Sequence, residues 1–147
     1  MNGKWLALFI VSYIVAISLN FFPSMKFPDV SVNGFHFLAT SIFLIGLSIY
    51  ILKGIKSVRD IHRLRLFSLV GVLSGFIIYV FHIVERFGAG SFSGDIIAFF
   101  QYPFYFIFTT PMFGGNFLFQ VDYGMYALFT SFIYLIFFLW VRTKMEY

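Results

Sequence analysis

Four stretches of the chain run for 18 or 19 residues without a charged side chain. They are Trp5–Phe22, Phe35–Leu52, Leu66–Val84 and Tyr123–Val141. An α-helix of that length is roughly 27–29 Å long, about the thickness of the hydrocarbon core of a bilayer. Backbone polar groups in that layer need partners within the protein, so we expect all four stretches to be transmembrane helices.

A fifth uncharged stretch has a different pattern. Its apolar part, Ile96–Phe113, contains Pro103 and Pro111 and is followed by Gly114 and Gly115. Proline removes a backbone donor and disrupts the preceding helical turn, which disfavours a straight span. The segment is also rich in aromatic side chains, which are typical of the membrane–water interface. We therefore predict an interfacial or re-entrant segment over about 96–113, with a fifth span as the alternative.

Small and polar residues recur on one face of each predicted span. On the third span Ser68, Gly71 and Gly75 share a face, and the two glycines form a small-xxx-small pair. Small residues allow transmembrane helices to approach closely. We expect these three residues to pack against another helix of the bundle, and a homodimer contact is the alternative. The other spans have a similar face. It is formed by Ser12, Ala16 and Asn20 on the first span, by His36, Ala39, Thr40, Phe43, Gly46 and Tyr50 on the second, and by Gly124, Ala127 and Ser131 on the last.

Composition supports this pattern. The 147 residues are 61 % hydrophobic and 11 % charged, whereas about a quarter of residues are charged in soluble domains. The sequence therefore predicts an all-α integral membrane protein in which residues 1–147 form one domain, a four-helix transmembrane bundle in contact with lipid. Cysteine is missing, which excludes disulfides and thiol chemistry.

The basic residues predict the orientation. Lys53, Lys56, Arg59, Arg63 and Arg65 crowd the connection between the second and third spans. By the positive-inside rule this connection is cytoplasmic, and with four spans both termini are cytoplasmic too. We expect location in the cell membrane, and we attribute the net charge of +4 to topology rather than to nucleic-acid binding. The same five residues could also contact anionic lipids or an acidic partner.

Candidate chemistry lies on the opposite side. His36 opens the second span, His82 lies near the end of the third, and Glu85 follows one helical turn later. Imidazole and carboxylate groups together suit a divalent metal, so His36, His82 and Glu85 form a candidate metal site. The more ordinary interpretation is that they are solvated or hydrogen-bonded helix-end residues, and we predict no cofactor.

The sequence leaves two classes of function open. It lacks H-E-x-x-H, paired-carboxylate and Ser-x-x-Lys patterns, so we expect no enzyme activity. We also identify no motif of a known small membrane-protein family. The first hypothesis is an accessory, immunity or regulatory protein that acts through contacts with other membrane proteins or with itself. The second is a small protein that handles an ion, metal or ligand through the His/Glu cluster.

Overall fold

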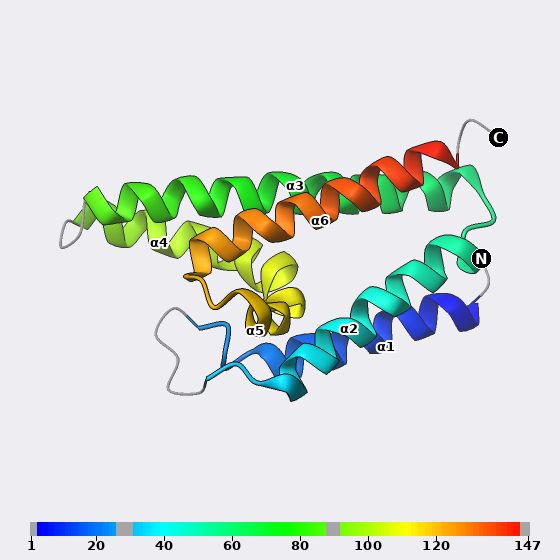
Figure 1. Cartoon of the computed structure of the whole chain (residues 1–147). Helices are drawn as coiled ribbons and strands as arrows, with labels where there is room; N and C mark the ends of the chain where they lie inside the picture. The colour runs from blue at the N-terminus through cyan, green and yellow to red at the C-terminus, as the bar shows by residue number, and fades with distance from the viewer. Residues whose placement is uncertain (1–2, 26–30, 88–91, 145–147) are drawn as a thin grey trace.

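A computed structural model describes residues 3–25, 31–87 and 92–144 of the chain (Figure 1). All of its regular structure within those ranges is helical, which confirms the predicted all-α fold. The elements, in order, are α1 (Gly3–Asn20), α2 (Gly34–Ile49), the π-helix η1 (Tyr50–Gly54), α3 (Val58–Phe87), α4 (Phe92–Phe104), the π-helix η2 (Tyr105–Thr109), the 3₁₀-helix η3 (Thr110–Gly115), α5 (Asn116–Phe119) and α6 (Tyr123–Thr143).

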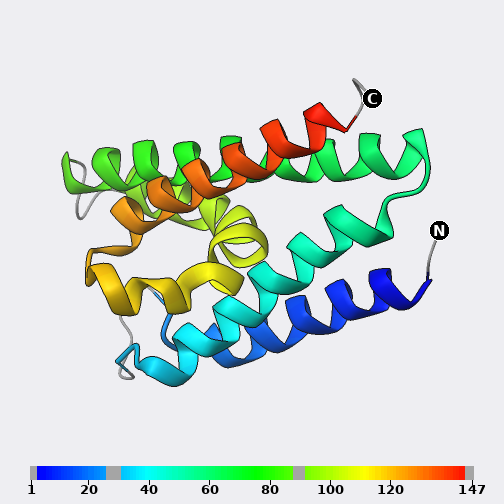
Figure 2. The same cartoon turned by 45° about the vertical axis from the view of Figure 1, so that its right-hand side comes forward.

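The long helices form two antiparallel pairs, α1 with α2 and α3 with α6 (Figures 1 and 2). Glycines bring α3 and α6 together. Gly71 lies against the ring of Tyr134, and Gly75 lies against the backbone oxygen of Ala127. Ser68 is fully buried on the same face. This face of α3 is thus covered by α6 of the same chain, where the homodimer alternative would need it free.

The two ends of the bundle differ. At one end α1 begins, α2 passes into α3, and α6 finishes (Figure 1). We call this the basic end, because it carries Lys4, Lys53, Lys56, Arg59, Arg63, Arg65, Arg142 and Lys144. At the opposite end α3 finishes and α6 begins, which the ion pair between Arg86 and Asp122 confirms (3.3 Å).

The segment from α4 to α5 enters and leaves the bundle at the opposite end. The helix α4 packs along α3, η3 contacts α1 and α2, and α5 leads back to the start of α6 (Figure 2). The segment changes from α- to π-helix after Phe104 and from π- to 3₁₀-helix after Thr109, and both changes lie between Pro103 and Pro111. It therefore lies between the two helix pairs and turns back inside the bundle.

Side chains of the long helices donate hydrogen bonds to carbonyl groups of this irregular backbone. Tyr126 donates to the oxygen of Met112 (2.6 Å), and Tyr134 donates to that of Phe108 (3.0 Å). Other donors to the segment are Tyr13 to Ile107, Asn20 and Thr40 to Pro111, and Ser74 to Phe104. Non-helical backbone at membrane depth is tolerated only when protein or water satisfies it, and here all four long helices contribute.

Helix α3 begins earlier than the charge pattern predicts. It starts at Val58 rather than Leu66, and Arg59, Arg63 and Arg65 belong to its first turns instead of a loop. With 30 residues it is about 45 Å long, well beyond the roughly 30 Å hydrocarbon core. Its charged start can therefore extend out of the apolar layer. Helix α1, helix α2 with η1, and helix α6 cover the other three uncharged stretches to within a few residues.

The outward surface of the long helices is apolar. Large side chains such as Ile14, Leu38, Phe76 and Ile136 are more than half exposed. Within the described residues, five helical segments are long and apolar enough to cross a membrane, and the fifth is the broken segment Gly94–Phe119. The chain is thus a multi-pass membrane protein whose lipid-facing surface is hydrophobic.

Candidate functional site

Polar side chains gather at the opposite end, where α3 meets α6. The imidazole Nε2 of His82 lies 3.2 Å from Asp122, which also caps α6 by accepting from the backbone of Met125. One turn later on α3, Glu85 accepts hydrogen bonds from Gln101 (2.9 Å) and Tyr123 (2.5 Å). The two hydrogen bonds of Glu85 and the contact between His82 and Asp122 join α4 and α6 to α3.

The third predicted metal ligand has a separate structural role. His36 closes a capping box at the start of α2, where its Nδ1 accepts from the backbone N–H of Asn33 (3.1 Å). In residues 3–25, 31–87 and 92–144, no three His, Asp or Glu side chains are grouped so that they could hold a metal ion. The structure therefore assembles no metal site from His36, His82 and Glu85, and the metal hypothesis stays a prediction.

The basic end carries the second set of predicted site residues. Lys53, Lys56, Arg59 and Arg63 are exposed, and Arg65 lies over the ring of Phe138 (5.3 Å). Two lysines lie close to the Trp5 ring, with the ammonium of Lys4 at 5.1 Å and that of Lys53 at 5.4 Å from its centre. Tryptophan flanked by basic residues is typical of the membrane–water interface.

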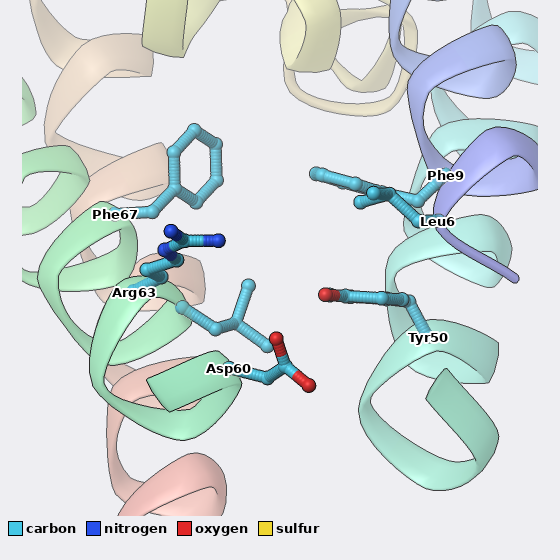
Figure 3. A pocket seen from close by; sticks show the side chains of 7 residues that line it. Leu6, Phe9, Tyr50, Asp60, Arg63 and Phe67 are labelled. Carbon is cyan, nitrogen blue, oxygen red and sulfur yellow. The ribbon is translucent and has the colours of Figure 1, made fainter. Parts of the chain in front are cut away.

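A cavity of about 220 Å³ opens between the two helix pairs at the basic end (Figure 3). Apolar side chains form most of its walls, with Leu6 and Phe9 from α1 and Phe67 from α3. The polar groups are Tyr50, Asp60 and Arg63, and Leu64 completes the lining. In Figure 3 the hydroxyl of Tyr50 points across the cavity toward the side of Asp60 and Arg63.

Helix register places Asp60 in this cavity. Ser57 precedes α3 and caps it, with its hydroxyl accepting from the backbone N–H of Asp60 (3.2 Å). Asp60, Leu64 and Phe67 then follow at helical spacing on one face, which continues into the buried stripe that faces α6. The start of α3 at Val58 thus directs the side chain of Asp60 away from water and toward the apolar walls of the cavity.

The carboxylate of Asp60 is buried without full compensation. The residue is only 4 % exposed, and its Oδ2 has no hydrogen-bond partner among the described residues. Buried carboxylates normally have a partner, because leaving water costs several kcal/mol per ion (order of magnitude). An unpaired acceptor that lines a cavity is therefore a candidate binding group.

A second hollow adjoins the cavity at the protein surface. Ser57, Val58 and Arg59 line it together with Asp60 and Arg63, which both cavities share. Arg63 and Asp60 thus line both hollows, and Arg59 lines the outer one. Together they offer guanidinium groups for an anion, an acceptor for a cation or hydrogen-bond donor, and apolar walls.

The chain matches no family model, no curated protein sequence and no solved structure. The evidence for the candidate site is therefore its own geometry. Sequence reasoning missed Asp60, since it treated the residue as part of a basic loop. The available signal was its spacing of four residues from Leu64 and eight from Ser68, which extends the polar stripe of the third span backward.

Proposed function

We propose that the protein is a non-enzymatic, ligand-binding protein of the cell membrane that takes up one end of an amphipathic molecule at its basic end. The observation that carries this proposal is the Asp60 carboxylate in a largely apolar cavity, whose Oδ2 has no hydrogen-bond partner among the described residues. Pockets that bury a whole drug-sized ligand measure about 300–1,000 Å³, and this cavity is smaller. It therefore suits a cationic or hydrogen-bond-donating end of a longer molecule.

The proposal includes a topology of four crossings with both termini in the cytoplasm. Eight basic residues at one end support it through the positive-inside rule. The return of the α4–α5 segment to the end at which it entered also supports an even number of crossings. The ligand site would then face the inner leaflet.

Of the two functions that the sequence left open, the site favours the handling of a ligand, at a different place from the His/Glu cluster. Each long helix directs its small and polar face into the bundle. The hypothesis of an accessory, immunity or regulatory protein stays a prediction, because it requires a surface for a protein partner.

Filling the cavity tests the proposal. Leu6 lines the cavity, whereas Leu8 on the same helix is exposed on the lipid-facing surface. Thermal unfolding of purified protein in a nonionic detergent is measured with and without dodecylammonium, a single-chain cationic amphiphile. Binding at about 100 times Kd adds roughly 2.7 kcal/mol, which corresponds to a rise of several degrees in Tm.

We expect dodecylammonium to raise the Tm of the wild type and of Leu8→Trp, and to leave that of Leu6→Trp unchanged. The two variants add the same side chain to α1, so a general effect of the amphiphile would act on both alike. An equal rise in Leu6→Trp, or no rise in the wild type, would contradict binding in the cavity.

A further inference from the structure

We infer that the ligand of the cavity is an aminophospholipid of the inner leaflet, with its ammonium at Asp60 and its phosphate between Arg59 and Arg63. This inference rests on the proposed ligand-binding function and specifies the ligand. It follows from the charges of the site, from the unpaired oxygen and from the depth of the cavity in the membrane.

The charges of the site match a zwitterion. Asp60 and Arg63 line the same cavity, so a simple cation pairs with the carboxylate but leaves the guanidinium without a partner, and a simple anion does the reverse. A molecule with a cationic group at its tip and an anionic group next to it satisfies both. Arg59 in the adjoining hollow strengthens the anionic position, and guanidinium groups bind phosphate in a bidentate manner.

The unpaired oxygen requires a hydrogen-bond donor. The Oδ2 of Asp60 can accept a hydrogen bond, and a primary ammonium has three N–H donors. A quaternary ammonium has none and is bulkier. An ethanolamine head group therefore satisfies the carboxylate, whereas a choline head group leaves it unbonded in an apolar environment. The site should discriminate between the two.

The depth of the cavity matches the head-group region. Leu6 lines it and follows Trp5 in the sequence, and the ammonium groups of Lys4 and Lys53 lie close to the Trp5 ring. Such a tryptophan marks the interface. Deeper in the bundle, Phe9 and Phe67 provide apolar walls that lie in edge-to-face contact with each other (6.2 Å between ring centres). A lipid of the same leaflet can enter such a site without leaving the membrane.

The test measures lipid binding by native mass spectrometry. Purified, delipidated protein is titrated with phosphatidylethanolamine or phosphatidylcholine of identical acyl chains, which differ only in methylation of the amine. The variants are Asp60→Asn and Arg63→Gln. Their controls are Asp95→Asn on α4, which is exposed at the opposite end, and Arg142→Gln on α6, which is exposed at the basic end.

We expect the wild type and both controls to bind phosphatidylethanolamine about tenfold or more tightly than phosphatidylcholine, as expected for a charge-assisted hydrogen bond. Asp60→Asn should abolish this preference, and Arg63→Gln should weaken the binding of both lipids. Asparagine has the shape of aspartate and replaces a carboxylate oxygen that has no hydrogen-bond partner among the described residues, so folding should be preserved. A Tm equal to or higher than that of the wild type confirms this.

Two outcomes would overturn the inference. One is equal binding of the two lipids by the wild type, and the other is a preference that survives in Asp60→Asn. If dodecylammonium still stabilises the wild type but not Leu6→Trp, the proposed function stands and only the identity of the ligand is wrong. If dodecylammonium has no effect either, both proposals fail.

Discussion

At the scale of single residues, Asp60 and the glycines of α3 have opposite effects on stability. The Asp60 carboxylate is buried and its Oδ2 has no hydrogen-bond partner among the described residues, an arrangement that generally costs stability. Gly71 and Gly75 instead allow α3 and α6 to approach until backbone and ring atoms touch. A residue that costs stability without aiding packing is typical of a functional site.

The close approach of α3 and α6 gives a prediction for Gly75. A Cβ at this position would collide with the carbonyl oxygen of Ala127, which belongs to a helix backbone and cannot rotate away. We expect Gly75→Ala to destabilise the protein by about 1–2 kcal/mol, because the cost of overpacking exceeds the gain in helix propensity. Thermal unfolding in detergent measures the effect.

Gly34 provides the control for this prediction. It also lies in a helix, but a Cβ there would have no neighbour within 4 Å. Gly34→Ala should therefore leave the Tm unchanged or slightly higher. Equal Tm values for Gly75→Ala and the wild type would mean that the two helices can separate at no cost.

At the scale of elements, the α4–α5 segment depends on hydrogen bonds from outside itself. Its π- and 3₁₀-helical turns do not repeat the regular α-helical bonding, and its carbonyl groups accept from side chains of α1, α2, α3 and α6. Because these donors come from both helix pairs, the segment also joins the pairs to each other. Its conformation is therefore a property of the bundle rather than of its own sequence.

Removing one donor tests this dependence. In Tyr126→Phe the ring keeps its packing, but the oxygen of Met112 loses its hydrogen bond (2.6 Å). A buried polar group without a partner costs about 1–3 kcal/mol. We expect a lower Tm and faster hydrogen exchange in the backbone of residues 105–115, measured by mass spectrometry. Tyr102→Phe, at a tyrosine that is 46 % exposed, should change neither quantity.

The helices were predictable because lipid imposes a strong pattern. Uncharged stretches of membrane length have to be helical. Small and polar faces of such helices are expected to pack inside the bundle, and the face with Ser12, Ala16 and Asn20 is buried there. Pro103 and Pro111 correctly indicated a broken segment. The start of α3 was missed because charged residues were taken to end the helix, although a helix can continue beyond the apolar layer.

The candidate site was less predictable than the fold. The hydroxyl groups of Tyr126 and Tyr134 bond to carbonyl groups of a segment that has no regular geometry, so spacing along the sequence does not reveal the pairs. The cavity depends on the separation of two helix pairs, which hydropathy does not encode. Of the residues in the candidate site, Asp60 could have been found from its helical spacing to Leu64 and Ser68. That spacing is meaningful only if α3 is known to begin before Asp60.

At the scale of the whole molecule, the bundle is asymmetric along its long axis. The opposite end is filled by the α4–α5 segment and fastened by the contacts of His82, Glu85 and Asp122. The basic end has no such filling element among the described residues, and the cavity lies there between the helix pairs. If the basic end is cytoplasmic, the protein is closed toward the outside and open toward the inner leaflet.

The lack of cysteine makes this topology directly testable. Single cysteines are introduced at three exposed positions, as Asp95→Cys at the opposite end and as Ser57→Cys and Thr143→Cys at the basic end. Intact cells are treated with a membrane-impermeant maleimide. We expect labelling of Asp95→Cys alone, with the other two labelled only after permeabilisation. If the segment Gly94–Phe119 crossed the membrane, Thr143→Cys would be labelled in intact cells while Ser57→Cys would not, and the four-crossing topology would be wrong.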